Sequence, residues 1–144
     1  MSVLKPFNRR KTKQTVAPIR AHTTWSPNEV RGVIERLVDA DRDETQHKHA
    51  AKAVAKPRSF AARAMKMHLH LARTADGYLL SYPYDYKSRN DWVAELTIAA
   101  DRSGSMVTSH VVRWLEKDGE LSAAVVYLKF VDALGIALGS GDLR

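Results

Sequence analysis

Alternation between apolar and polar residues predicts several β-strands in this chain. Over residues 78–86, four tyrosines fall on even-numbered positions, so in an extended strand they share one face. Residues 64–72 and 92–100 alternate in a similar way. The polar turn at 74–77 would join residues 64–72 to residues 78–86 in a hairpin. We therefore expect an antiparallel sheet with an aromatic face.

Residues 106–115 fit either a strand or a helix. As a strand, the segment places one set of side chains on one face, namely Met106, Thr108, His110, Val112 and Trp114. A helix capped by Ser103 would instead align Val107, Val111, Trp114 and Leu115. Because the β-branched residues of this segment favour extended structure, we predict a strand.

The first predicted helix begins after Ser26, which has the sequence of a capping box with Glu29 and is followed by a proline at the first helical position. Apolar residues then recur at helical spacing through about residue 40. The four charged residues 41–44 predict a polar break after this helix. The alanine-rich basic run at 46–56 is then expected as a separate surface helix or a loosely held segment.

The last predicted helix spans residues 121–138 and is rich in apolar side chains. Its main buried stripe is expected to contain Ala124, Leu128, Val131, Leu134 and Leu138. The predicted fold class is α+β, with an antiparallel sheet packed against a long C-terminal helix and an N-terminal capped helix. We assign residues 1–20 to a basic flexible arm and 21–144 to a single domain.

Positive charge is concentrated in two segments. The chain has a net charge of +7, and residues 45–75 contain seven Lys or Arg and four His but no Asp or Glu. The arm also lacks acidic residues. Such segments favour a polyanionic partner, nucleic acid or an anionic surface, although a solvated surface explains the same charges. The candidate polyanion-binding residues are Arg9, Arg10, Lys11, Lys48, Lys52, Lys56, Arg58 and Arg63.

Chemical motifs are sparse. The absence of Cys excludes disulfides and thiolate chemistry, and neither the pair His47 and His49 nor the pair His68 and His70 has an evident third metal ligand. No pattern nominates a catalytic residue, a metal site or a cofactor. The first residues lack the apolar segment of a signal peptide, and the charges of the last helix argue against a membrane span, so we expect a cytoplasmic protein.

The tyrosines have two interpretations. Exposed beside cations they would stack on nucleic-acid bases, whereas on the inner face of the sheet they would pack against the last helix. We favour the inner face, which makes aromatic side chains candidates for lining a ligand pocket. These candidates are Tyr78, Tyr82, Tyr84, Trp92 and Trp114.

Three stretches, namely residues 26–30, 92–98 and 104–108, are followed by an amphipathic C-terminal helix, and this order resembles the helix-grip superfamily that includes START domains and polyketide cyclases. The resemblance covers roughly residues 16–138 by order of elements. It implies a curved antiparallel sheet around the C-terminal helix and an enclosed apolar ligand. The basic segments depart from the pattern of that family.

Residues 94–98, followed by a possible helix that ends at 115–119, are also similar to coat proteins of single-stranded RNA phages. That resemblance implies an oligomer that binds RNA on a sheet face, but the early helix does not fit it. We predict a noncatalytic binding module that holds an apolar small ligand under the C-terminal helix and recruits an anionic partner through its arm. The alternative is a nucleic-acid-binding or assembly protein, and the surplus apolar surface of the last helix is compatible with a homo-oligomer.

Overall fold

The computed structural model describes residues 18–56, 58, 64–65, 67–84, 89–114 and 122–139. For residues 83–84, 89–91, 113–114 and 122–125 the description covers the backbone only. The predicted arm therefore lies outside the described residues, apart from its last three positions.

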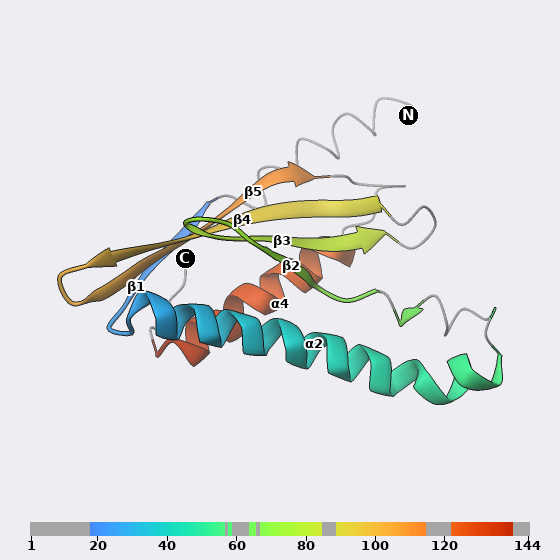
Figure 1. Cartoon of the computed structure of the whole chain (residues 1–144). Helices are drawn as coiled ribbons and strands as arrows, with labels where there is room; N and C mark the ends of the chain where they lie inside the picture. The colour runs from blue at the N-terminus through green and yellow to red at the C-terminus, as the bar shows by residue number, and fades with distance from the viewer. Residues whose placement is uncertain are drawn as a thin grey trace, which may run out of the picture.

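Among the described residues, five antiparallel strands form one sheet, and two helices cover one of its faces (Figure 1). The elements follow in the order β1 (Ile19–Thr23), α2 (Pro27–Ala55), β2 (His70–Arg73), β3 (Gly77–Tyr84), β4 (Arg89–Asp101), β5 (Gly104–Trp114) and α4 (Ser122–Ala137). Their order across the sheet is β1-β5-β4-β3-β2. The predicted α+β class and antiparallel sheet are confirmed.

Helix α2 begins as predicted. The Ser26 hydroxyl accepts a hydrogen bond from the Glu29 amide at 3.3 Å, and the Glu29 carboxylate accepts one from the Ser26 amide at 2.9 Å. The two bonds satisfy amide groups that a helix start otherwise leaves without partners. The bond from the Ser26 amide lowers the pKa of the Glu29 carboxyl, and a hydrogen bond with the Ser26 side chain lowers it further.

The expected break at residues 41–44 is wrong, because α2 continues through it to Ala55. Asp, Arg, Glu and Gln are all tolerated inside a helix, and the segment contains no Gly or Pro before Pro57. Arg42 also forms an ion pair with Asp39, one turn earlier, at 3.3 Å. The polar residues therefore mark a change in what the helix contacts, and the helix does not end there.

The predicted hairpin of β2 and β3 is confirmed, but the strand expected over residues 64–72 is wrong for most of its length. Only His70–Arg73 form β2. The Leu69 amide donates to the Asp41 carboxylate at 2.7 Å, and the Met67 carbonyl accepts from the Tyr82 hydroxyl at 3.2 Å. Because side chains occupy these backbone groups, residues 67–69 do not pair with a neighbouring strand.

Strands β4 and β5 form the centre of the sheet, and the strand prediction for residues 106–114 is confirmed. The register shifts between Val93 and Ala94, which pair with Arg113 and Val111 and leave Val112 as an extra residue in β5. This bulge ends the strict alternation along β5, so the predicted grouping of Trp114 with Met106, Thr108, His110 and Val112 does not follow from simple period-two counting.

Strand β1 was not expected from the sequence. It pairs with β5, with Ile19 opposite Ser109 and Thr23 opposite Ser105. Its first two residues belong to the segment that was assigned to the arm. Residues 19–23 are too few to show a clear period, so the pairing with a strand about 85 residues away was not visible in the local pattern.

The C-terminal helix α4 has 16 residues and is shorter than α2, which has 29, so the long helix of this protein is the N-terminal one. Of the stripe predicted for α4, Val131, Leu134 and Leu138 are buried, but Leu128 is 39% exposed and the Ala124 side chain lies outside the described residues. Tyr127 takes the place expected for Leu128. Its hydroxyl lies 2.6 Å from the Ser109 hydroxyl, which allows the phenol to be fully buried.

Within the described ranges, no helix is both long enough and apolar enough to span a membrane.

Candidate functional site

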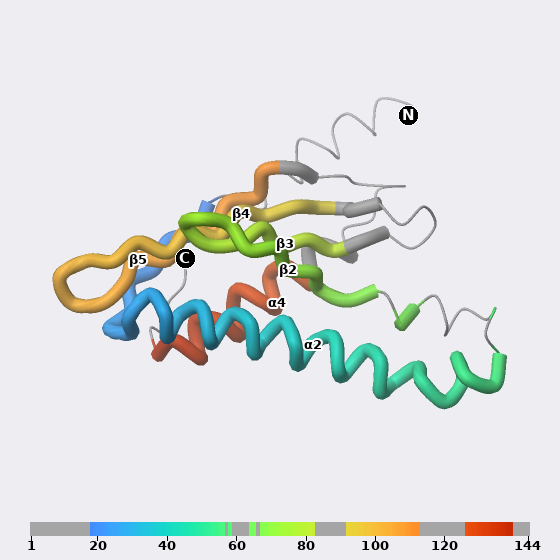
Figure 2. Tube along the Cα trace, in the orientation of Figure 1, coloured from blue at the N-terminus to red at the C-terminus, as the bar shows by residue number. Residues whose placement is uncertain are grey.

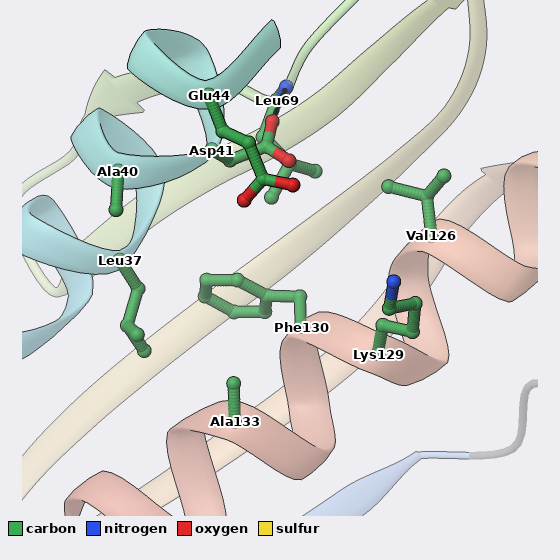
Figure 3. A pocket seen from close by; sticks show the side chains of 9 residues that line it. All are labelled: Leu37, Ala40, Asp41, Glu44, Leu69, Val126, Lys129, Phe130 and Ala133. Atoms are coloured by element: carbon green, nitrogen blue, oxygen red, sulfur yellow. Dashed lines mark hydrogen bonds between the residues drawn. The ribbon is translucent and has the colours of Figure 1, made fainter. Parts of the chain in front are cut away.

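The two helices leave a groove between them on the covered side of the sheet (Figure 3). Its volume is about 260 Å³. Phe130 of α4 points across the groove toward α2, the Glu44 carboxylate points into it from α2, and Lys129 lies on the side of α4. The full lining is Leu37, Ala40, Asp41, Glu44, Leu69, Val126, Lys129, Phe130 and Ala133.

A second hollow of about 350 Å³ lies farther along α2. It shares Asp41 and Glu44 with the first groove, so the two adjoin at these carboxylates. Its lining is more polar and consists of Asp41, Glu44, Thr45, Lys48, His49, Ala64, Met67 and Tyr82. Together the two hollows follow one side of α2, with an apolar part near α4 and a polar part near β3.

Asp41 joins two parts of the chain where the two hollows adjoin. One of its carboxylate oxygens accepts the hydrogen bond from the Leu69 amide, which holds the chain before β2 against α2. On the other side, the Tyr82 hydroxyl donates to the Met67 carbonyl. Burial raises the pKa of Tyr82, and the negative charge of Asp41 raises it further, so Tyr82 keeps its proton at neutral pH.

Behind Tyr82 lies an aromatic cluster. The Tyr82 and Trp92 rings are nearly parallel with centroids 6.5 Å apart, and Trp92 meets Tyr127 edge-on at 5.2 Å. The indole nitrogen of Trp92 is buried and has no hydrogen-bond partner among the described residues. The space beneath α4 is thus filled by ring systems, with Trp92 and Tyr127 fully buried.

The five predicted ligand-lining residues separate into three groups. Tyr82 lines the second hollow, and Trp92 belongs to the core behind it. Tyr78 is only 1% exposed and connects the sheet to α2: its hydroxyl donates to the Glu35 carboxylate and the Arg31 guanidinium lies 5.0 Å from its ring centroid. Tyr84 and Trp114 lie in β3 and β5, but their side chains are outside the described part.

Arg31 and Tyr78 together join α2 to the hairpin of β2 and β3. The Arg31 guanidinium donates to the carbonyls of Thr74, Ala75 and Gly77 at 3.2 to 3.4 Å, and so binds the turn between β2 and β3. Burial raises the pKa of Tyr78, and the bond to Glu35 adds to this effect. The Tyr78 ring therefore joins α2 to the hairpin, and it lines neither of the two hollows described above.

The predicted polyanion-binding residues are brought together only in part. Lys48, Lys52 and Lys56 are exposed along α2, and Arg58 is exposed just after it. Arg9, Arg10, Lys11 and Arg63 lie outside the described residues. Of the two basic segments, the structure therefore describes part of the second one, in which Lys48, Lys52 and Lys56 form a row along α2.

The histidines do not assemble a metal site in the described part of the chain, where no group of three or more His, Asp or Glu side chains could hold an ion. The His68 and His70 rings lie 4.4 Å apart. At the tip of β4 and β5, His22 contacts both Asp101 and Ser103, at 3.1 Å each, but through the same ring nitrogen. A hydrolytic triad needs the carboxylate and the hydroxyl on opposite ring nitrogens, so this cluster does not fit one.

Sequence reasoning missed the groove residues Asp41, Glu44 and Phe130. The two acids lie in the segment expected as a helix break, and Phe130 lies outside the stripe of the last helix that was expected to be buried. The sequence did contain a signal for the two acids: Leu37, Asp41 and Glu44 follow one another at spacings of four and three residues, which places them on the same side of a helix.

The fold and site define an α+β protein whose single antiparallel sheet carries two helices and an interhelical groove. No protein-family model, no curated protein and no solved structure matches this chain.

Proposed function

We propose that the chain is a noncatalytic binding module that holds a small molecule with an apolar body in the groove between α2 and α4. The observation that carries the proposal is the contrast within the groove lining. Leu37, Val126 and Phe130 offer an apolar surface, while two carboxylates and a lysine ammonium lie at its edge. Ligand sites in proteins combine a mainly apolar lining with a few polar groups in this way.

The ligand position differs from the one expected from the sequence. Trp92 of β4 and Tyr127 and Leu134 of α4 are fully buried between the helix and the sheet, so a molecule enclosed there would have to displace core side chains. The groove beside α4 needs no such displacement. We therefore move the proposed site from the inner face of the sheet to the side of α4 that faces α2.

The charged groups suggest where the polar part of a ligand would lie. Asp41 and Glu44 stand where the two hollows adjoin, and Tyr82 and Lys48 lie beyond them. An amphipathic molecule would place its apolar body against Phe130 and its polar head near these carboxylates. Recruitment of an anionic partner by Arg9, Arg10 and Lys11 remains a prediction beside this site, as does a cytoplasmic location.

The test is to fill the groove and measure binding. Ala133 lines the groove, and Ala133→Phe would occupy part of its volume, whereas Ile136→Phe changes a side chain that is 77% exposed on the same helix and outside the lining. Nile red, an uncharged and mainly apolar fluorescent probe, is titrated against the two variants and the original chain. Native mass spectrometry of each purified protein records ligands that copurify.

We expect Ala133→Phe to weaken probe binding about tenfold, equivalent to about 1.4 kcal/mol, and to remove copurified small molecules. Ile136→Phe should change neither. Equal probe affinity for the original chain and Ala133→Phe, with both folded by circular dichroism, would exclude the groove as the site.

A further inference from the structure

The C-terminal half of α2 is a helix that the core does not require. All buried residues of α2 lie between Val30 and Val38, and none of residues 39–56 is buried. Figure 2 shows the last turns of α2 extending past the end of the sheet and past α4. This half persists as helix because alanine, which has the highest helix propensity, occupies four of positions 50–55.

Three exposed lysines follow one side of this projecting half. Lys48, Lys52 and Lys56 recur every four residues, which separates them by about 6 Å along the axis and keeps them within an arc of about 80°. Residues 45–56 contain no acid. None of the ion pairs in the described part of the chain involves these lysines, so their charges are available to a partner.

Stabilisation of the helix end explains only part of this row. Cations favour a helix C-terminus, but the effect falls off within the last turn. That reason covers Lys52 and Lys56. Lys48 lies two turns before the end, where the macrodipole gives it little stabilisation, so the helix end does not account for the start of the row.

We propose that this half of α2 is a docking face for duplex DNA, on which Lys48, Lys52 and Lys56 contact backbone phosphates. Ala51 and Ala55 flank the row on one side, where their small side chains allow a close approach, and His49 flanks it on the other side. The major groove of DNA is about 12 Å wide and admits an α-helix. Arg58, exposed just after the helix, extends the positive charge.

Two other anionic partners fit this surface less well. A helix that lies on a membrane inserts Trp, Phe or Leu between lipids, and residues 45–56 contain none of these. Single-stranded nucleic acid is bound largely by stacking on aromatic rings, but Tyr78 is buried and Tyr82 partly so. In the described part of this half of α2 no Phe, Tyr or Trp side chain lies beside the lysines, and the exposed Val54 lies on the opposite side of the helix, so the row favours the phosphates of a duplex.

The experiment compares two variants of the full chain with equal net charge. The first is Lys48→Gln/Lys52→Gln/Lys56→Gln, and the control is Arg20→Gln/Arg73→Gln/Arg102→Gln, which removes three exposed cations from strands and a turn outside α2. A third protein, Lys48→Arg/Lys52→Arg/Lys56→Arg, keeps the charge. Each is titrated with fluorescent duplex DNA of mixed sequence over a range of salt concentrations, with a single strand and phosphatidylserine vesicles as parallel probes.

Each phosphate contact contributes about 0.9 to the slope of log affinity against log salt, so we expect the lysine-to-glutamine variant to lose about 2.7 from its slope. Between 50 and 200 mM salt, the original chain should then lose about 40-fold more affinity than this variant. The arginine variant should keep the original slope, and the control should keep most of it. Equal slopes for the two glutamine variants would overturn the proposal, as would a loss confined to vesicles or to the single strand.

Discussion

Leu134 and Leu128 on α4 offer a direct test of which side of this helix is buried. Leu134 is fully buried in the core, whereas Leu128, which the sequence pattern placed on the buried stripe, is 39% exposed. The same substitution to Ala at both positions removes the same three carbons from one helix. Differences in helix propensity therefore cancel, and the comparison reports burial alone.

The expected magnitudes follow from the transfer free energy. Three buried carbons at about 0.8 kcal/mol each give about 2.4 kcal/mol, and the cavity left in a packed core raises the cost of Leu134→Ala to about 3 to 4 kcal/mol. Leu128 keeps part of its surface in water and leaves no enclosed cavity. Leu128→Ala should therefore cost about 1.5 kcal/mol or less.

Urea unfolding followed by circular dichroism measures both changes, provided that the variants share one m value. Leu134→Ala should lower the free energy of unfolding at least twice as much as Leu128→Ala. Equal losses, or a larger loss for Leu128→Ala, would show that α4 packs with a different side toward the sheet, and the groove lined by Phe130 would then lose its basis.

Two further predictions concern Gly77 and Tyr127. A Cβ at Gly77 would overlap with the backbone carbonyl of Leu96, which cannot move aside, so Gly77→Ala should lower the free energy of unfolding in urea by about 1 to 3 kcal/mol. A Cβ at the helical Gly32 would meet only the flexible Arg36 side chain, so Gly32→Ala should raise that free energy by about 0.5 to 1 kcal/mol. Two substitutions of the same sign would contradict this contrast. Burial raises the pKa of Tyr127, so the unfolded chain ionises first and the free energy of unfolding should fall as the pH rises above about 10. Tyr127→Phe should reduce that fall in an alkaline series of urea midpoints, and an unchanged slope would show that Tyr127 does not contribute.

Local sequence signals determined those parts of the structure that depend on near neighbours. The capping box at Ser26 and Glu29 involves residues three apart, and the hairpin of β2 and β3 depends on the short turn that joins them. The alternation of Trp92, Ala94, Leu96 and Ile98 likewise identified a strand with one buried face. Each signal lies within one turn or a few residues, which is the range over which periodicity carries information.

Only the tertiary structure decided features that depend on contacts far apart along the chain. Asp41 meets the Leu69 amide across 28 residues, and this contact both shortens β2 and places a carboxylate in the groove. Tyr127 displaces Leu128 from the core because Ser109, on another element, provides a partner for its hydroxyl. Helical periodicity ranks side chains by apolarity and carries no information about such a partner on another element. The buried side of α4, and with it the groove, is therefore determined only by the packing of the helices on the sheet.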